Sequence, residues 1–375
     1  MPSQQKTWIE IDRKALAGNV KVIRGLLTPN TKLWAVVKSN AYGHGLSTFS
    51  KTADTLGVDG FCVDSVIEGL KLRREGITKP VLVLGPTLAG LAKQATDPDI
   101  TISIASIDAL KQLVREISQP SRRPNVHIKI DSGMHRQGFY IEQLPQALAF
   151  IKKHGIRVTG IFSHFASAKD INYPTYSQRQ FITFERAVRA FHDAGFTDIV
   201  RHIAATGGTI INPAYHLDAV RIGIGLYGIY PSKELETQLS DTVKLQPILS
   251  WRSIISELKA VPKGEYIGYD FTEKTTRKTT LAIVPVGYWH GLPWALSGIG
   301  YVLVSGKRCK LLGRVAMDMV AVDTTGIKSK VGSKVTLIGD DKPETITARE
   351  MAGRANTTPY EIITRLNPLI ERIVI

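Results

Sequence analysis

The chain reads Leu33-Trp34-Ala35-Val36-Val37-Lys38 across an apolar run that ends in one amine. A polar turn containing Gly43 and Gly45 follows at once, and glycine lets a backbone approach a ligand closely. The run predicts a buried strand, and a lysine at its carboxyl end is placed to form a Schiff base. The alternative is a lysine that ends a strand by reaching solvent, which is the commoner arrangement when this stretch is considered alone.

Short runs rich in Val and Ile recur along the first two-thirds of the chain. Candidate strands lie at 33–40, 60–64, 80–85, 100–105, 126–131, 158–164, 200–206 and 219–224. Their nearly continuous apolar character is typical of strands buried on both faces. Helical spacing separates them, as at Ile107, Leu110, Val114 and Ile117. Eight strand-plus-helix units predict an α/β fold with a closed parallel (β/α)8 barrel of the TIM type, and a doubly wound open sheet is the alternative.

The pattern changes after about Pro231. Segments at 248–260, 280–286, 301–303 and 334–339 alternate apolar with polar residues, with Gly and Pro between them. This alternation predicts a mainly antiparallel β domain. We therefore expect a barrel over residues 12–233 and a β domain over 234–375, with a linker at 231–234 and the N-terminal strand, residues 1–11, joined to the β domain.

The composition excludes several classes of protein. Lysine and arginine exceed aspartate and glutamate by 48 − 33 = 15, which speeds association with anionic ligands. Because the basic residues are scattered, without zinc-finger spacing or an aromatic platform, we expect no nucleic-acid partner. No apolar run reaches about 18 residues and no signal peptide is evident, so we expect no membrane span. Two cysteines predict no disulfide framework and a reducing, cytoplasmic location.

Polar residues follow the predicted barrel strands. Chemistry in such barrels collects at the carboxyl ends of strands. Those ends carry Lys38, Asp64, Gly85, Ser106, the turns 131–136 and 221–225, His164 and Thr206. A lysine, an arginine pair, a histidine and small or hydroxyl turn residues would thus share one mouth. The set suits an anionic cofactor that bears an aldehyde, and we expect no metal site.

Two glycine turns are candidate phosphate sites. Residues 223–228 spell G-x-G-x-x-G, but a dinucleotide site needs a helix to open next, and Pro231 disfavours one there. Backbone amides of such a turn can still cradle a phosphate. Thr206-Gly207-Gly208 is either a second phosphate turn or a simple left-handed turn. Likewise, His164 is either functional or a core histidine, and Arg136 either clamps a carboxylate or forms a surface ion pair.

Taken together, these stretches resemble the alanine racemases, barrel-type enzymes that use pyridoxal 5'-phosphate (PLP). The resemblance spans nearly the whole chain and is carried by residues 35–45, 129–138, 220–223, 267–269, 315–318 and 360–361. It implies an isomerase that interconverts L- and D-alanine by two bases and supplies D-alanine for peptidoglycan. It also implies a cytoplasmic homodimer with shared active sites and a small amino acid as substrate.

The resemblance further implies a role for each matching residue. Lys38 would hold the cofactor and act as one base, and Tyr269 would be the second base. Arg136 would bind the substrate carboxylate, helped by Lys129, which is carbamylated in some family members. Arg221 would donate to the pyridine nitrogen, and His164 would hydrogen-bond to Tyr269 or Arg221. The phosphate would be held by Tyr42, Thr206, Gly223, Ile224 and Tyr360, and the partner subunit would supply Met317, Asp318 and Tyr269.

Racemisation itself explains the pair of bases, because a proton leaves one face of the α-carbon and another arrives on the opposite face. A free tyrosine has a pKa near 10, so a tyrosine base needs a cation or donor nearby. Arginine at the pyridine nitrogen keeps its own proton, which weakens the electron sink and limits side reactions.

The chain departs from the family pattern at three places. His135 replaces a glycine, residues 204–207 read Ala-Ala-Thr-Gly in place of Ala-Asn-Ser-Ala, and residues 288–294 replace Tyr-Ala-Asp-Gly-x-Pro-Arg. The last stretch introduces Trp289, His290 and Trp294, so the preferred amino acid, serine included, stays open. A decarboxylase of the related barrel fold is a second hypothesis, which Arg136 disfavours because a cation stabilises the carboxylate that must leave. A non-enzymatic PLP carrier is a third, which the extra β domain disfavours.

Overall fold

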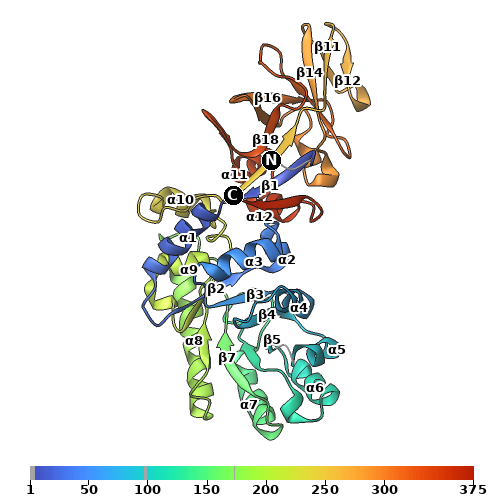
Figure 1. The fold of residues 1–375 in the computed structure, drawn as a ribbon. Helices are drawn as coiled ribbons and strands as arrows, with labels where there is room; N and C mark the ends of the chain where they lie inside the picture. Colours follow the sequence, from blue (N-terminus) through green and yellow to red (C-terminus); the bar gives the residue numbers. More distant parts are fainter. Residues whose placement is uncertain (1–4, 97–98, 173) are drawn as a thin grey trace. The chain divides into compact units, whose positions relative to one another are not determined.

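The computed structural model describes residues 5–96, 99–172 and 174–375 (Figure 1). They fall into two units by their contacts. The barrel unit comprises Lys14–Ser39 and Phe49–Pro247, and the β unit comprises Asn40–Thr48, Ile248–Ile375 and the N-terminal residues to Arg13. Residues 233 and 234, expected in a linker, instead begin helix α10 (Lys233–Leu239), because Ser232 accepts a hydrogen bond from the Leu235 N–H and caps it. The predicted domain boundary between residues 233 and 234 stays a prediction.

Eight parallel strands form the sheet of the barrel unit, in the order β8-β7-β6-β5-β4-β3-β2-β9. They are β2 (Lys32–Val36), β3 (Gly60–Val63), β4 (Val81–Pro86), β5 (Ile100–Ile104), β6 (Val126–Lys129), β7 (Val158–Phe162), β8 (Val200–His202) and β9 (Ala219–Ile222). A parallel bridge between Ala205 and Arg221 brings β8 next to β9 and nearly closes the circle. The predicted barrel is therefore confirmed, and the alternative of a doubly wound open sheet is wrong.

Helices lie outside these strands in Figure 1. The longer ones are α1 (Arg13–Leu26), α3 (Leu46–Thr55), α4 (Val66–Arg74), α6 (Ile107–Glu116), α7 (Leu144–Lys153) and α8 (Thr175–Asp193). Helix α6 shows why they form. Ser106 caps its first turn by accepting from the Ala109 N–H, and Leu110 and Leu113 are buried on one face. The barrel unit thus buries both faces of its sheet, as its apolar strands predict.

The β unit contains a mainly antiparallel sheet in the order β11-β14-β17-β16-β15-β18-β10-β1-β20, with β19 beside β18. The strands are β1 (Thr7–Ile11), β10 (Leu249–Ile254), β11 (Glu257–Val261), β14 (Thr279–Val284), β15 (Tyr301–Val304), β16 (Lys307–Leu312), β17 (Val320–Asp323), β18 (Lys334–Asp341), β19 (Glu344–Ile346) and β20 (Glu371–Val374). The N-terminal strand β1 lies antiparallel to β10 and parallel to β20. A small hairpin of β12 (Tyr266–Ile267) and β13 (Glu273–Lys274) and the helices α11 (Ala348–Arg354) and α12 (Pro359–Thr364) complete the unit.

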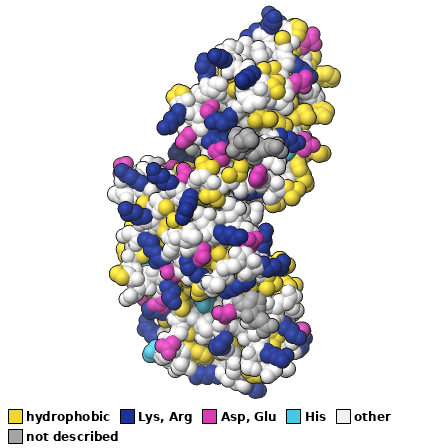
Figure 2. Space-filling view, viewed as in Figure 1, with side chains coloured by type: hydrophobic (Ala, Val, Ile, Leu, Met, Phe, Trp, Pro, Cys, Tyr) yellow, Lys and Arg dark blue, Asp and Glu magenta, His cyan; other side chains and the backbone are white. Residues whose placement is uncertain are grey.

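None of the helices formed by the described residues is long and apolar enough to cross a membrane. Lysine and arginine side chains are spread over the face shown in Figure 2 rather than gathered into one stripe. Both cysteines, Cys62 and Cys309, are buried and unpaired. Burial raises the pKa of the Cys62 thiol to about 12, so it stays protonated and inert.

Candidate active site

Lys38 lies just beyond the carboxyl end of β2, as the sequence predicts. The Val37 N–H still bonds to the Cys62 carbonyl of the neighbouring strand, so the sheet holds the backbone up to this point. The Lys38 ammonium lies 3.6 Å from Asp64 Oδ1, at the end of β3. Both side chains are partly exposed, so this pair is a weak one that a ligand can replace.

The backbone after Lys38 is left-handed over four residues, which was not predicted. Residues 39–42, in the short helix α2 (Lys38–Tyr42), have φ values of 54°, 57°, 53° and 51°, although none is glycine. Each such residue costs about 1–2 kcal/mol relative to the right-handed form. The turn is held by Ser39 N–H donating to Glu68 Oε1 at 2.8 Å and by Leu46 N–H donating to Asn40 Oδ1 at 2.9 Å. Strain of this kind collects at functional sites.

Arg221, on β9, places a buried guanidinium inside the barrel. Its Nη2 donates to the Ser163 carbonyl at 2.7 Å and to the Ile203 carbonyl at 3.0 Å. His164 Nδ1 lies 3.4 Å from the same nitrogen. Burial lowers the pKa of Arg221 to about 10, which leaves the group charged at neutral pH. The structure therefore brings His164 to Arg221, as one of the two predicted arrangements requires.

Two further buried histidines extend from Arg221. Arg221 Nη1 lies 2.5 Å from His202 Nδ1, and His202 Nε2 lies 2.8 Å from His127 Nδ1. A guanidinium can only donate, so His202 accepts at Nδ1 and donates from Nε2 to His127. Burial first, and then the charge of Arg221, lowers the pKa of His127 to about 3, and the pKa of His202 also lies far below its usual value. Both rings are therefore neutral, in one defined tautomer each.

Neighbouring residues restrict the orientation of the His127 and His202 rings. The Phe162 ring stacks on His202 at 5.0 Å with an interplanar angle of 3°. A Cβ on Gly160 would lie 2.4 Å from the His127 ring, so only glycine fits there. We did not predict a role for either histidine, because both lie within strand patterns. The signal that was present is a polar residue in the middle of an apolar strand, as in Val126-His127-Ile128-Lys129.

Arg136 is carried by a loop that Asp131 organises. The Asp131 carboxylate accepts the backbone N–H groups of Gly133, His135 and Arg136 at 3.0, 2.9 and 2.9 Å. Burial would raise the pKa of Asp131, but these three donors hold it below its usual value. His135, where the family has glycine, adopts a left-handed φ of 52°. The loop therefore presents Arg136 from a fixed backbone.

Lys129 belongs to the same positive cluster. Its ammonium donates to Gln137 Oε1 at 2.8 Å. Burial lowers the pKa of Lys129 to about 8, and the charges of Arg136, Arg221 and Lys38 lower it further in the same direction. The four predicted cations thus interact within the barrel unit. A cluster of this sign attracts a small anion.

The two predicted glycine turns meet at Thr206, which begins helix α9 (Thr206–Ile211). The Gly225 N–H donates to Thr206 Oγ1 at 3.2 Å, and a Cβ on Gly225 would lie 2.6 Å from Thr206 Cγ2. A Cβ on Gly207 would lie 1.9 Å from the Ala168 carbonyl. Gly223 and Ile224 are buried in the same turn. No helix opens until Lys233, so the dinucleotide interpretation is wrong, for the reason that Pro231 indicates.

The remaining predicted residues lie in the β unit. The rings of Tyr42 and Tyr360 are 6.0 Å apart, and burial raises the pKa of Tyr360 to about 12. Tyr269 stands at the tip of the β12–β13 hairpin with 69% of its surface exposed, and Met317 is 55% exposed. Within one chain, therefore, the structure shows Tyr269 and Met317 on an open surface.

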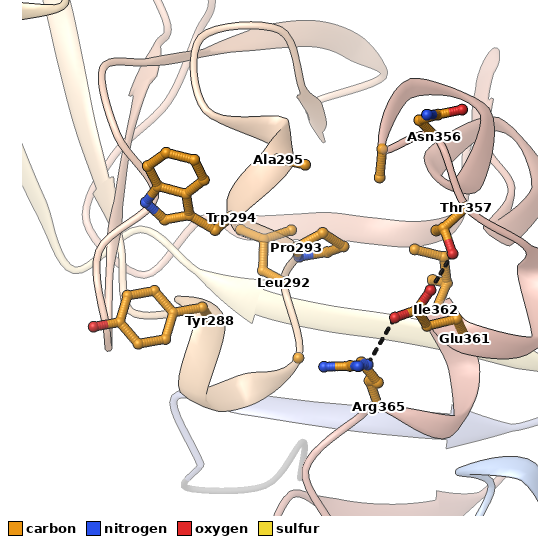
Figure 3. Close-up of a pocket in the computed structure, with 12 residues that line it drawn as sticks. Tyr288, Leu292, Pro293, Trp294, Ala295, Asn356, Thr357, Glu361, Ile362 and Arg365 are labelled. Atoms are coloured by element: carbon orange, nitrogen blue, oxygen red, sulfur yellow. Dashed lines mark hydrogen bonds and ion pairs between the residues drawn. The ribbon is translucent and has the colours of Figure 1, made fainter.

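A pocket of about 860 Å³ lies in the β unit beside the stretch that departs from the family pattern (Figure 3). Tyr288 and Trp294 form one side, and residues of α12 form the other. There, Glu361 and Arg365 form an ion pair at 2.9 Å. Trp289 is exposed, whereas His290 is buried, with Nδ1 accepting the Gly287 N–H.

Comparisons with known proteins agree over both parts of the chain. The family model of the alanine racemase N-terminal domain matches residues 11–231, and that of the C-terminal domain matches residues 248–374. The alanine racemase of Leptospira interrogans is 38% identical, covering 100% of this chain and 97% of that protein. The alanine racemase of Methanococcus maripaludis is 34% identical, covering 98% of each.

Solved structures show the same relationship. The crystal structure of alanine racemase from Bacillus anthracis with bound L-Ala-P superposes with a TM-score of 0.94 at 33% identity, covering 100% of this chain and 96% of that one. The alanine racemase from D-cycloserine-producing Streptomyces lavendulae gives 0.91 at 32% identity, covering 100% and 98%. The resemblance stated from the motifs is confirmed.

Acidification is expected to destabilise the barrel unit through its neutral histidines. The pKa of His127 is about 3 in the folded chain and about 6.5 when unfolded, so the unfolded chain binds more protons between these values. The contribution of neutral His127 to folding stability is therefore fully present above about pH 6.5 and is lost progressively as the pH falls. In urea unfolding between about pH 7 and pH 5, His127→Gln should reduce the pH slope of the unfolding free energy by up to about 1.4 kcal/mol per pH unit. His192→Gln, on an exposed part of α8, is the control, and an unchanged slope in His127→Gln would contradict the assignment.

Proposed function

The chain belongs to the alanine racemase family, and we propose that it interconverts L- and D-alanine with PLP as its cofactor. The observation that carries this proposal is the position of Lys38 at the end of a barrel strand. Its charge and that of Arg221 add to burial in lowering the pKa of Lys129. The matches of both family domains speak against a PLP carrier made of a barrel alone and against the decarboxylase hypothesis. Serine as preferred substrate has no specific support.

The residues present fit PLP. The cofactor has a phosphate, a ring nitrogen and an aldehyde. The hydroxyl of Thr206, at the start of helix α9, suits the phosphate, and Gly207 and Gly225 let the turns pack closely around it. We propose that Gly223, Ile224, Tyr42 and Tyr360 complete this site. When bound, PLP supplies the electron sink that acidifies the α-proton of an amino acid. Lys38 would hold it covalently through its amine.

Arg221 would donate a hydrogen bond to the ring nitrogen of the cofactor and keep its own proton. Its pKa of about 10 and its bonds to two carbonyls and His202 hold the guanidinium charged and oriented. A donor that does not give up its proton leaves the ring nitrogen neutral. The electron sink is then weaker, which confines the enzyme to proton transfer at the α-carbon.

Two bases would move the proton, one from each face. Tyr269 would exchange the α-proton of L-alanine and Lys38 that of D-alanine, so each base serves one face. Arg136 would grip the substrate carboxylate, and Met317 would line the substrate site. With a pKa of about 8, about a tenth of Lys129 is an unprotonated amine at pH 7, the form that can take up carbon dioxide as a carbamate. We propose that this modification supports Arg136.

We propose that the enzyme is a homodimer in which Tyr269, Met317 and Asp318 serve the partner's site. The support is the number of large apolar side chains that the β unit exposes, among them Tyr266, Tyr269, Phe271, Trp289, Trp294, Met317 and Met319. Figure 2 shows hydrophobic side chains along one edge of this unit. Exposed apolar patches mark protein interfaces. A cytoplasmic role in supplying D-alanine to peptidoglycan is part of the same proposal.

Removal of the amine tests the cofactor assignment. The purified wild-type protein should be yellow, and borohydride should fix the cofactor on the peptide that contains Lys38. Lys38→Ala should leave no fixed adduct, because no other amine occupies that strand end. Lys32→Ala, at the opposite end of β2, should behave like the wild type. Peptide mass spectrometry after reduction gives the answer, and an adduct that persists in Lys38→Ala would refute the assignment.

Tyr269→Phe should lower the racemisation rate by about 10²–10⁴-fold, because one of the two proton carriers is lost. Lys38 still works in this variant, so uptake of α-deuterium from heavy water into D-alanine, with retention of configuration, should persist. Chiral chromatography with mass detection measures both. Tyr301→Phe, which removes a hydroxyl elsewhere in the β unit, is the control, and normal racemisation by Tyr269→Phe would exclude the second-base role.

Mixing inactive subunits tests the shared site. In a dimer of Lys38→Ala with Tyr269→Phe, one site holds both intact residues if Tyr269 acts in the partner. Random mixing of chains in a two-fold symmetric dimer should restore up to about a quarter of the wild-type activity. A mixture that stays inactive, although mass spectrometry shows mixed dimers, would place both residues in one chain.

A further inference from the structure

The hairpin that carries Tyr269 is anchored at its base and strained at its tip. At the base, Ile267 packs on Leu281 and Leu312, and Lys310 donates to the Glu273 carboxylate. The hairpin strands β12 and β13 have two residues each. The tip between them contains Gly268, Asp270 and Phe271 with φ values of 73°, 63° and 53°. For Asp270 and Phe271 this left-handed backbone is unfavourable by about 1–2 kcal/mol each, so contacts from outside the tip must maintain it.

The ion pair at the tip itself comes from Arg314. Its Nε lies 3.4 Å from Asp270 Oδ2, an ion pair. That Nε is buried and forms no hydrogen bond with the described residues, so charge and not a directed bond holds the carboxylate. A Cβ on Gly313 would lie 2.5 Å from the Ile267 carbonyl, which shows that the backbone before Arg314 abuts the hairpin. Like the Lys38–Asp64 pair, a partly exposed ion pair without a directed bond is weak, so its effect on the tip depends on how firmly the cation is oriented.

The indole of Trp294 supplies that orientation. The Arg314 guanidinium carbon lies 4.7 Å from the centre of the Trp294 ring. Cation–π contacts of this kind are favourable by about 0.5–1 kcal/mol at exposed sites. Ser297 ties the two loops together, because its Oγ donates to the Trp294 carbonyl at 2.5 Å and accepts the Val315 N–H at 3.0 Å. Trp294, Arg314 and Asp270 thus form a stack of ring, cation and carboxylate.

We propose that Trp294 and Arg314 are positioning residues for Tyr269. The indole orients the guanidinium, the guanidinium holds Asp270, and Asp270 fixes the strained turn from which the phenol projects. The inference rests on the proposed role of Tyr269 as a base. It explains what Trp294 does at the edge of the pocket in Figure 3, where its ring stands on the side opposite the Glu361–Arg365 pair. A proton carrier must lie within hydrogen-bond reach of the α-proton that it transfers. A loosened turn should therefore slow proton transfer on the Tyr269 face only.

The test uses the full-length holoenzyme and compares racemisation with deuterium exchange. Trp294→Leu should lower the racemisation kcat by about ten- to a hundredfold, because displacement of a catalytic group by about 1 Å can cost 10²-fold. The KM for alanine should change little, and α-deuterium uptake into D-alanine with retention, which depends on Lys38, should stay at the wild-type rate. Trp294→Phe retains a ring face and should restore most of the activity.

The chain offers a closely matched control. Arg354 lies 4.7 Å over the Tyr301 ring and donates from Nε to Glu350 Oε1 at 3.4 Å, so it too joins a ring and a carboxylate, at another place in the β unit. Tyr301→Leu should therefore keep the wild-type ratio of racemisation to exchange. A Tyr301→Leu variant that loses racemisation in the same way would overturn the inference, because the loss would then be general.

Two further outcomes would also overturn it: wild-type racemisation by Trp294→Leu, or an equal fall in racemisation and exchange. If Trp294→Leu does not fold, Asp270→Asn decides, since it removes the charge at an exposed carboxylate and should give the same selective loss. Tyr269→Phe separates the two claims. If Tyr269→Phe racemises alanine normally, the proposed function fails. If Tyr269→Phe loses racemisation but Trp294→Leu and Asp270→Asn keep it, only the positioning role fails.

Discussion

A buried guanidinium is the constraint on which the site depends. Arg221 sits inside the barrel, where an isolated charge is strongly unfavourable unless its donors are satisfied. Two backbone carbonyls and His202 accept from it, and the Phe162 ring lies 5.3 Å from its centre. These partners are neutral. The positive charge is therefore satisfied but not cancelled. Burial lowers the pKa of His127, His164 and Lys129, and the charge of Arg221 lowers it further.

This electrostatic arrangement explains the chemistry that the site is suited to. An uncancelled charge, added to those of Lys38, Lys129 and Arg136, favours an anionic cofactor and a carboxylate substrate. Burial, together with the same charge, keeps His202 and His127 neutral, so their hydrogen bonds run in one direction and orient the guanidinium. A fixed donor with a retained proton is what a racemase needs, because a protonated ring nitrogen would open competing reactions.

Backbone strain marks both proposed bases. Residues 39–42 after Lys38 and residues 270–271 after Tyr269 are left-handed without being glycine. In each case a side-chain contact from another element maintains the strained backbone, Glu68 for the first turn and Arg314 for the second. A strained turn aims a side chain away from the course that a regular strand or helix would give it. Short strands of two residues, or a strand end, leave that turn to be set by tertiary contacts.

The sequence alone determined the eight barrel strands, because strands buried on both faces must be apolar throughout, and it placed Lys38, Arg136 and Arg221 near strand ends. It overestimated strand length, predicting 33–40 where β2 ends at Val36 and 200–206 where β8 ends at His202, since apolar residues continue beyond the last paired one. Only the tertiary structure decided that His127 and His202 meet over the intervening strand β7, that residues 39–42 turn left-handed, and that Trp294 lies on Arg314. These features join residues that are far apart in the chain or depend on the sign of φ, and neither spacing nor propensity in a sequence encodes them.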